Sequence, residues 1–321
     1  MTEEGNTTQQ TPVVYDGTHE PRRQTPVWLM YLGLTLSTLF AVEAPFLSGI
    51  LFGTILRTLA ESQGSKAFTH AIGISVLCIF VRGFIALPAG FAVLTTTAAA
   101  IGIVRLMWAK KADTTHVAAL IVAIACISML IDSAYAAASG TTIPEVMTSY
   151  LEQMFSVQAG VVNLDTQIMN QLLIDVYVLL WPLTYMLSAA MSVTYAALGS
   201  YFSAFSAGKC APVRGLPSYD APLWTVGVLA TSILLMAFGT MPSPVSQVLL
   251  TVGLTAAMSV RVIFLMQGLG VVSAKLLPRT GCLMRFFIIS FAFWLEMMFM
   301  IVSIIGLVDI WANFRKLKRS N

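Results

Sequence analysis

The fold is decided by two apolar runs, VAALIVAIACISMLIDSAYAAA at 117–138 and IDVYVLLWPLTYMLSAAMSVTYAALGSYFSAFS at 174–206. Both lie in a stretch from Ala112 to Gly208 that contains no Lys or Arg, although basic residues stand on either side of it. Basic residues near the ends of membrane crossings stay on the cytoplasmic side. The pattern therefore predicts two crossings joined by an external segment, within an all-α, polytopic membrane protein.

The composition agrees with this interpretation and excludes other classes. Of the 321 residues, 57% are hydrophobic and only 10% are charged, whereas soluble domains carry about 25% charged residues. The net charge of +3 is too small for the dense basic face of a nucleic-acid-binding protein. The four cysteines form no CxxC or Cys/His cluster, so we expect neither a disulfide framework nor a zinc site.

Composition along the chain divides it into three parts. Residues 1–25 are polar and are expected to form a disordered cytoplasmic tail. Residues 26–310 are expected to form a single transmembrane helical domain, in which 139–173 is an extracytoplasmic segment with one or two amphipathic helices. Residues 311–321 form a basic C-terminal tail. The predicted location is the bacterial plasma membrane, with the lipid bilayer as solvent.

The apolar runs predict about eight transmembrane helices, in eight or nine runs. The first run, from Val27 to about Ala60, is interrupted at Glu43-Ala44-Pro45, because Pro breaks a helix and restricts the residue before it. The run at 174–206 is longer than one crossing needs, and Pro182 is expected to kink it. The remaining runs lie at 68–87, 91–108, 117–138, 223–240, 246–274 and 286–308.

The orientation rule conflicts with itself after Arg214. Three crossings from that point would place the basic tail outside, yet Lys275, Arg279 and Arg285 also favour the inside. Either the run at 246–274 is broken at Gln267-Gly268, or one basic loop faces outward. A cytoplasmic C-terminus is favoured because the tail has the denser positive charge.

A row of small residues, Gly33, Ser37 and Ala41, recurs every four positions in the first run. Such a row lets another helix approach closely. It predicts a contact surface, which a partner membrane protein could occupy. The other interpretation is chance occurrence in a chain rich in Ala and Gly.

Five ionisable residues lie inside apolar runs: Glu43, Arg82, Asp132, Arg261 and Glu296. Because a charge at the membrane centre costs about 2.5–3.5 kcal/mol, each is expected to face the bundle interior and to have a partner. The available opposite charges are Arg82 or Arg261 with Asp132 or Glu296.

Two interpretations of these charges remain open. They could line a polar cavity, with the ligand-binding candidates Arg82, Arg261, Asp132, Glu296 and Gln267. They could equally be structural ion pairs or side chains that extend to the membrane surface. Similarly, Gln267-Gly268 could be an unwound helix segment at a ligand, or a site of close helix packing.

No feature indicates an enzyme. The sequence contains no phosphate-binding glycine loop, metalloprotease helix or nucleophile elbow. His19, His70 and His116 are too far apart in sequence to propose a metal site. We therefore expect no catalytic residue, no cofactor and no metal.

Three short motifs in the last third resemble the YybS-type family of predicted bacterial membrane proteins, a domain of unknown function. They are Leu-Pro-x-x-x-Ala-Pro-Leu-Trp ending at Trp224, Gln267-Gly268-Leu269-Gly270-Val271, and Gly306-Leu307-Val308-Asp309 followed by Asn313-Phe314-Arg315. Asn313 stands where the family pattern has an acidic residue. The first two-thirds of the chain are similar to the family only in layout.

The resemblance implies a function. The family is distantly similar in helix layout to the substrate-binding components of energy-coupling-factor vitamin transporters, which bind a small molecule between helices and associate with an energising module. It implies a small-molecule-binding, transport-associated protein, with a polar pocket opening outward under 144–172 and lined by Arg82 or Arg261. The alternative is a ligand-free scaffold or assembly protein that docks partners through the small-residue row and the inner basic loops.

Overall fold

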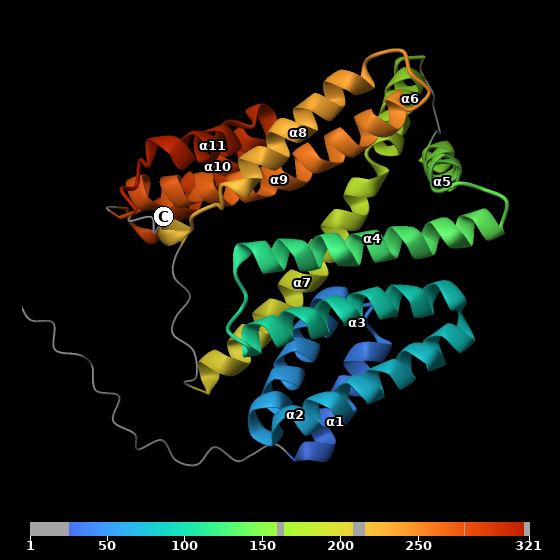
Figure 1. Ribbon diagram of the computed structural model, residues 1–321, viewed down its shortest axis with the longest axis vertical. Coiled ribbons are helices and arrows are strands. Elements are labelled where there is room, and N and C mark those ends of the chain that lie inside the picture. Colours follow the sequence, from blue (N-terminus) through green and yellow to red (C-terminus); the bar gives the residue numbers. More distant parts are fainter. Residues whose placement is uncertain (1–25, 159–163, 208–215, 279, 318–321) are drawn as a thin grey trace, which may run out of the picture.

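The computed structural model describes residues 26–158, 164–207, 216–278 and 280–317, and these are helical with short connections (Figure 1). The helices are α1 Val27–Leu39, α2 Pro45–Ile85, α3 Leu87–Trp108, α4 Thr114–Ala138, α5 Ile143–Gln158, α6 Leu164–Leu179, α7 Trp181–Ser206, the short 3₁₀ helix η1 Leu216–Ser218, α8 Trp224–Gly239, α9 Ser246–Leu276, α10 Cys282–Phe299 and α11 Ile301–Ala312. No strand occurs within the described ranges, so the all-α prediction is confirmed for them. The predicted tail at 1–25 lies outside the described residues.

Membrane-spanning character is shared by several of these helices. By length and composition, α2, α3, α4 and α9 could each cross a membrane. Two bent pairs, α6 with α7 and α10 with α11, bring the number of candidate spans to six if each pair is one span. The described chain is therefore a multi-pass helical protein of the membrane type.

Proline breaks the helices at two predicted positions. Pro45 occupies the first turn of α2, where its missing N–H costs nothing, so the interruption predicted at Glu43-Ala44-Pro45 is confirmed. Pro182 likewise occupies the first turn of α7, and α6 and α7 meet at an angle of 65°. The predicted kink at Pro182 is confirmed as a complete break between two helices.

α2 reverses direction at Gly64, which has φ 74° and ψ −160°, a conformation that glycine adopts most readily. Before this residue, positions 49–58 pack along 195–203 of α7 in the same order. After it, positions 68–83 pack along 90–108 of α3 in the reverse order. α3 and α7 begin at the same end of the bundle, since the first turns of both line one cleft. The two halves of α2 therefore cross the bundle in opposite directions.

The small-residue row on α1 faces α2 of the same chain. A Cβ on Gly33 would lie 2.8 Å from Cδ1 of Ile55, while Ser37 and Ala41 are buried. The predicted close helix contact is present, and Ile55 of α2 in the same chain makes it at Gly33. The expectation that a partner membrane protein contacts this row stays a prediction.

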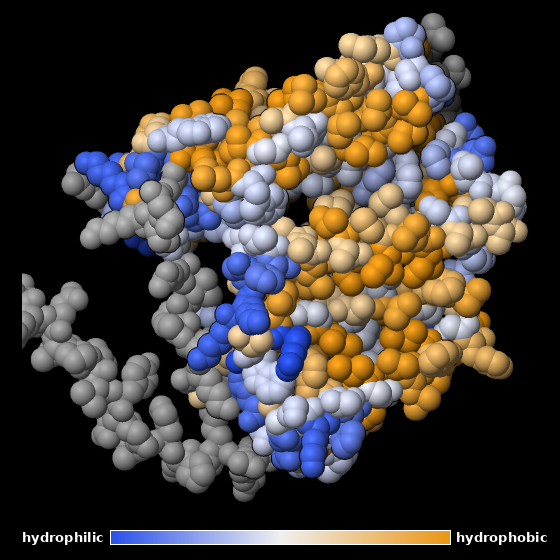
Figure 2. Space-filling model, in the orientation of Figure 1, coloured by the Kyte–Doolittle hydropathy of each residue, from blue (hydrophilic) through white to orange (hydrophobic). Residues whose placement is uncertain are grey.

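The basic ends of the helices meet at one end of the bundle, called here the basic end. Trp224 at the start of α8 donates its Nε1–H to Thr115 Oγ1 at the start of α4 at 3.0 Å. Arg315 donates from Nη1 to the backbone oxygen of Tyr219, just before α8, at 2.6 Å. Figure 2 shows hydrophilic surface concentrated along this side, while hydrophobic surface covers most of the rest of the visible face.

The sequence placed the residues around Lys275 and the basic tail on opposite sides if every run crosses once. A bend that the sequence did not indicate changes this. α9 is continuous through Gln267-Gly268, so the break there, one of the two alternatives, does not occur. Instead, α10 and α11 meet at 97° around Met300, which has φ 56°. This bend returns Arg315 to the end at which α8 begins, and α9 also ends there, since Gln267 bonds the N–H of Ala221. Lys275 and Arg315 therefore lie toward the same end of the bundle.

Candidate functional site

A polar cleft lies between α3, α4 and α7, near the end of the bundle opposite the basic end. Its volume is about 340 Å³. At its centre, the hydroxyl of Tyr185 donates a hydrogen bond to Oδ2 of Asp132 at 2.7 Å. The residues that line the cleft are Pro88, Phe91, Ala92, Thr95, Thr96, Ser128, Ile131, Asp132, Tyr185 and Ser188.

Helical spacing brings the polar groups of the cleft together. Ser128 and Asp132 are one turn apart on α4, and residues four positions apart lie on the same helix face. Tyr185 and Ser188 are three positions apart, a spacing that also places two residues on one helix face, and they lie within the first two turns of α7 after Pro182. Proline thus starts α7 close to the cleft and fixes where Tyr185 projects.

The hydroxyl groups of Thr95, Thr96 and Ser128 present acceptors rather than donors to the cleft. Thr95 and Thr96 donate their hydroxyl hydrogens to the carbonyl of Ala92, at 3.1 and 2.8 Å, and Ser128 donates to Ile124 at 2.9 Å. Each of these hydroxyl oxygens keeps acceptor capacity, and an ionised carboxylate only accepts. A ligand that fits this set carries a positive charge or several N–H or O–H donors.

Arg261 and Glu296 form the ion pair that the sequence allowed. Nε of Arg261 donates to Oε1 of Glu296 at 2.7 Å, and Nη2 donates to the Glu296 backbone oxygen at 3.0 Å. The carboxylate also accepts from the N–H and the hydroxyl of Ser303, at 2.9 and 2.6 Å. The acid is 3% exposed. Its bonds with Arg261 join α10 to α9, and its bonds with Ser303 cross the bend at Met300, so Glu296 ties α9, α10 and α11 together.

Arg82 pairs with Glu43 in the turn between α1 and α2, not with Asp132 or Glu296 as the sequence suggested. Both residues lie at the end of the bundle opposite the basic end. Arg82 does not line the Asp132 cleft. Of the predicted ligand-binding residues, Asp132 lines this cleft, and a pocket lined by Arg82 or Arg261 stays a prediction.

Gln267 belongs to a second buried network, at the basic end. Its amide oxygen accepts from the N–H of Ala221 at 2.9 Å, and its amide nitrogen donates to Oδ2 of Asp309 at 2.9 Å. Asp309 also accepts from Nη2 of Arg315 at 2.7 Å and from the N–H of Phe314 at 2.8 Å. The network joins α9, α11, the C-terminal tail and the segment before α8. Asp309 thus forms a local pair with the Phe314-Arg315 segment that follows α11.

Two glycines bring α9 and α11 into backbone contact beside this network. A Cβ on Gly268 would lie 1.9 Å from the Val302 oxygen, and one on Gly306 would lie 1.9 Å from the Phe264 oxygen. Close packing, rather than unwinding, accounts for Gly268. The three motifs that carried the family resemblance, far apart in sequence, meet at this crossing and network.

The candidate ligand residues thus separate into three places. Asp132 lies in the cleft, Arg261 and Glu296 lie at the α10–α11 bend, and Gln267 lies in the network at the basic end. Sequence reasoning missed Tyr185 and the hydroxyl groups of the cleft. The spacing of Ser128 and Asp132 was a signal that could have pointed to that wall.

Local surroundings shift the pKa values of two groups near the basic end, Tyr219 and Asp113. Burial raises the pKa of Tyr219, against the opposing effect of a hydrogen bond with Thr114. The backbone N–H of His116 lowers the pKa of Asp113, which caps the start of α4. Among the described residues, no group of three or more His, Cys, Asp or Glu side chains could hold a metal ion.

Comparison with family models, curated proteins and solved structures finds no match for this chain.

Proposed function

We propose that this chain binds a small cationic or donor-rich solute in the Asp132 cleft and serves as the solute-binding component of a transport system in the bacterial plasma membrane. The observation that carries the proposal is the acceptor-lined cleft between three helices of a membrane-type bundle. The role is binding rather than catalysis. It resembles that of the substrate-binding components of energy-coupling-factor transporters, to which the YybS-type family is similar in layout.

The proposed topology has about eight membrane crossings, counting the two halves of α2 separately. The two halves of α2 each have the length of one crossing, and α6–α7 forms one bent span. α10 and α11 enter and leave at the basic end, which is cytoplasmic by the positive-inside rule. Both termini are then cytoplasmic, and the Asp132 cleft lies toward the external side, near α5 and α6.

The cleft chemistry supports a positively charged solute. An intramembrane carboxylate is costly unless a donor or a cation compensates it, and a single bond from Tyr185 leaves acceptor positions on Asp132 available. A small solute with amine or guanidine groups would supply those donors. The surrounding hydroxyl oxygens of Thr95, Thr96 and Ser128 would accept from its remaining N–H groups.

Thermal unfolding of the purified protein tests this function with a panel of primary amines, guanidines and quaternary ammonium compounds. Binding to the folded state raises Tm. The Asp132→Asn variant removes the charge at nearly constant volume and should abolish the increase. Asp175→Asn is the matched control, because Asp175 accepts from Gln171 on α6 and does not line the cleft. Equal responses of both variants would contradict the assignment.

A ligand-free scaffold is the second candidate function, and one observation favours it. Arg82 and Arg261 are both paired with acids, so neither is available to a ligand as a free cation. A scaffold would dock its partner at the basic end. In crosslinking, a partner recovered equally with the wild type and Asp132→Asn, together with no Tm response to the solute panel, would favour the scaffold.

A further inference from the structure

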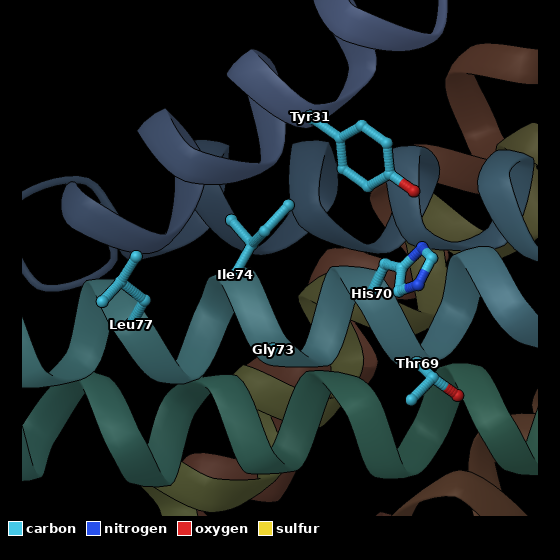
Figure 3. Close-up of a pocket in the computed structure, with 6 residues that line it drawn as sticks. All are labelled: Tyr31, Thr69, His70, Gly73, Ile74 and Leu77. Atoms are coloured by element: carbon cyan, nitrogen blue, oxygen red, sulfur yellow. The ribbon is translucent and has the colours of Figure 1, made fainter.

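A shallow groove separates α1 from the second half of α2, remote from the Asp132 cleft in sequence and lining. Its volume is about 540 Å³. Figure 3 shows the Tyr31 side chain from α1 and the His70 ring from α2 directed toward each other across one end, with Ile74 and Leu77 farther along α2. The lining residues are Tyr31, Thr69, His70, Gly73, Ile74 and Leu77.

The groove changes from polar to apolar with depth. Its polar end is near the basic end, because Phe68 lies against Trp108, over whose ring Arg105 stands at 5.1 Å. Lys66, an exposed cation, is one turn before His70 on the same helix face. From Lys66 to Leu77 the helix rises about 16 Å, which is the depth of one leaflet of a bilayer.

Gly73 leaves open space in the floor of this groove for no structural reason. A Cβ added there would meet no atom within 4 Å, whereas one on Gly53 would lie 2.2 Å from the Ala196 oxygen. Gly73 is helical, so its backbone does not require glycine, and glycine weakens a helix relative to other residues. The missing side chain therefore widens the groove without serving helix packing.

We propose that this groove binds one anionic phospholipid from the leaflet at the basic end. One acyl chain lies over Gly73 between Ile74 and α1, and the phosphate lies beside Lys66, Tyr31 and His70. A bilayer lipid is the ligand that supplies a polar head at the membrane surface and an apolar chain along the same axis. Cationic side chains at the membrane surface attract anionic lipids, which favours this class over zwitterionic ones.

Lipid retention measures this site directly. The protein is incorporated into nanodiscs of equal parts phosphatidylglycerol and phosphatidylcholine, extracted into mild detergent, and analysed by native mass spectrometry. The wild type should retain phosphatidylglycerol in preference to phosphatidylcholine. Gly73→Leu, which fills the groove, should lower retained phosphatidylglycerol several-fold. Lys66→Gln should reduce the preference for phosphatidylglycerol while leaving total retained lipid nearly unchanged.

The control is Gly227→Leu, at a helical glycine of α8 where an added Cβ also meets no atom within 4 Å. It should retain wild-type amounts of phosphatidylglycerol, and both leucine variants should unfold at or above the wild-type Tm. Equal retention by Gly73→Leu and the wild type would overturn the proposal. So would an absence of preference for phosphatidylglycerol in the wild type, or equal loss of lipid in both leucine variants.

Discussion

Asp309 of α11 accepts two hydrogen bonds from Arg315, at 2.7 Å from Nη2 and 3.1 Å from Nε, and neither side chain is more than 1% exposed. Arg315 also donates to the backbone oxygens of Pro217 and Tyr219, at 3.0 and 2.6 Å. One guanidinium thus fixes the C-terminal tail to the segment that leads into α8. This contact places the start of the C-terminal tail at the same end of the bundle as the start of α8.

Loss of Arg315 should destabilise the C-terminal half. Arg315→Ala leaves the buried carboxylate of Asp309 without its cation, and breaking a buried pair by removing one partner costs about 3–5 kcal/mol. Thermal unfolding in detergent should show a clearly lower Tm. Arg285→Ala is the control, because this arginine is exposed and donates to the backbone oxygen of Thr280. A Tm of Arg315→Ala equal to that of the control would contradict a buried tie.

The α10–α11 bend predicts that Lys275 and Lys316 are on the same side of the membrane. In a chain whose four native cysteines are replaced by serine, Lys275→Cys and Lys316→Cys should both react with an impermeant maleimide only from the cytoplasmic side. Ser243→Cys, in the turn between α8 and α9, should react from the outside. Labelling of the two lysine positions from opposite sides would exclude the arrangement in which α10 and α11 enter and leave the membrane at the same end.

The Arg261–Glu296 pair is expected to act structurally rather than to hold a ligand. Glu296→Gln removes the negative charge and should lower stability by about 3–5 kcal/mol, since Arg261 remains without its partner. The double variant Arg261→Met with Glu296→Met should be less destabilised than Glu296→Gln alone, because no unpaired charge is left. Chemical unfolding in detergent measures both. A double variant as unstable as Glu296→Gln, or less stable, would argue against this role.

The backbone contact between α9 and α11 predicts that Gly268 and Gly306 cannot carry a side chain. Either glycine replaced by alanine would force the helices apart, at a cost of about 1–3 kcal/mol for overpacking. Gly227→Ala in α8 has open space and should instead be neutral or stabilising, by up to about 1 kcal/mol. Tm values of the three variants separate the two cases. A stable Gly268→Ala protein would show that the crossing is looser than described.

The sequence alone determined the features that depend on local chemistry. Hydropathy predicted an all-helical membrane protein because a bilayer demands long apolar runs, whatever their partners. Pro45 and Pro182 marked helix breaks because a proline removes a donor from its own helix. The absence of Lys and Arg from Ala112 to Gly208 predicted which segment is separated from the basic end.

Tertiary structure decided everything that depends on distance between remote residues. Arg82 pairs with Glu43 and Arg261 with Glu296, 39 and 35 positions away, and charge alone could not select these partners from the alternatives. The bend at Met300 has no sequence signal, because its neighbours are apolar and include no Pro or Gly. It is fixed instead by the contacts of Glu296 and Ser303 across it. A single chain of apolar runs admits many packings, and the buried polar contacts select one of them.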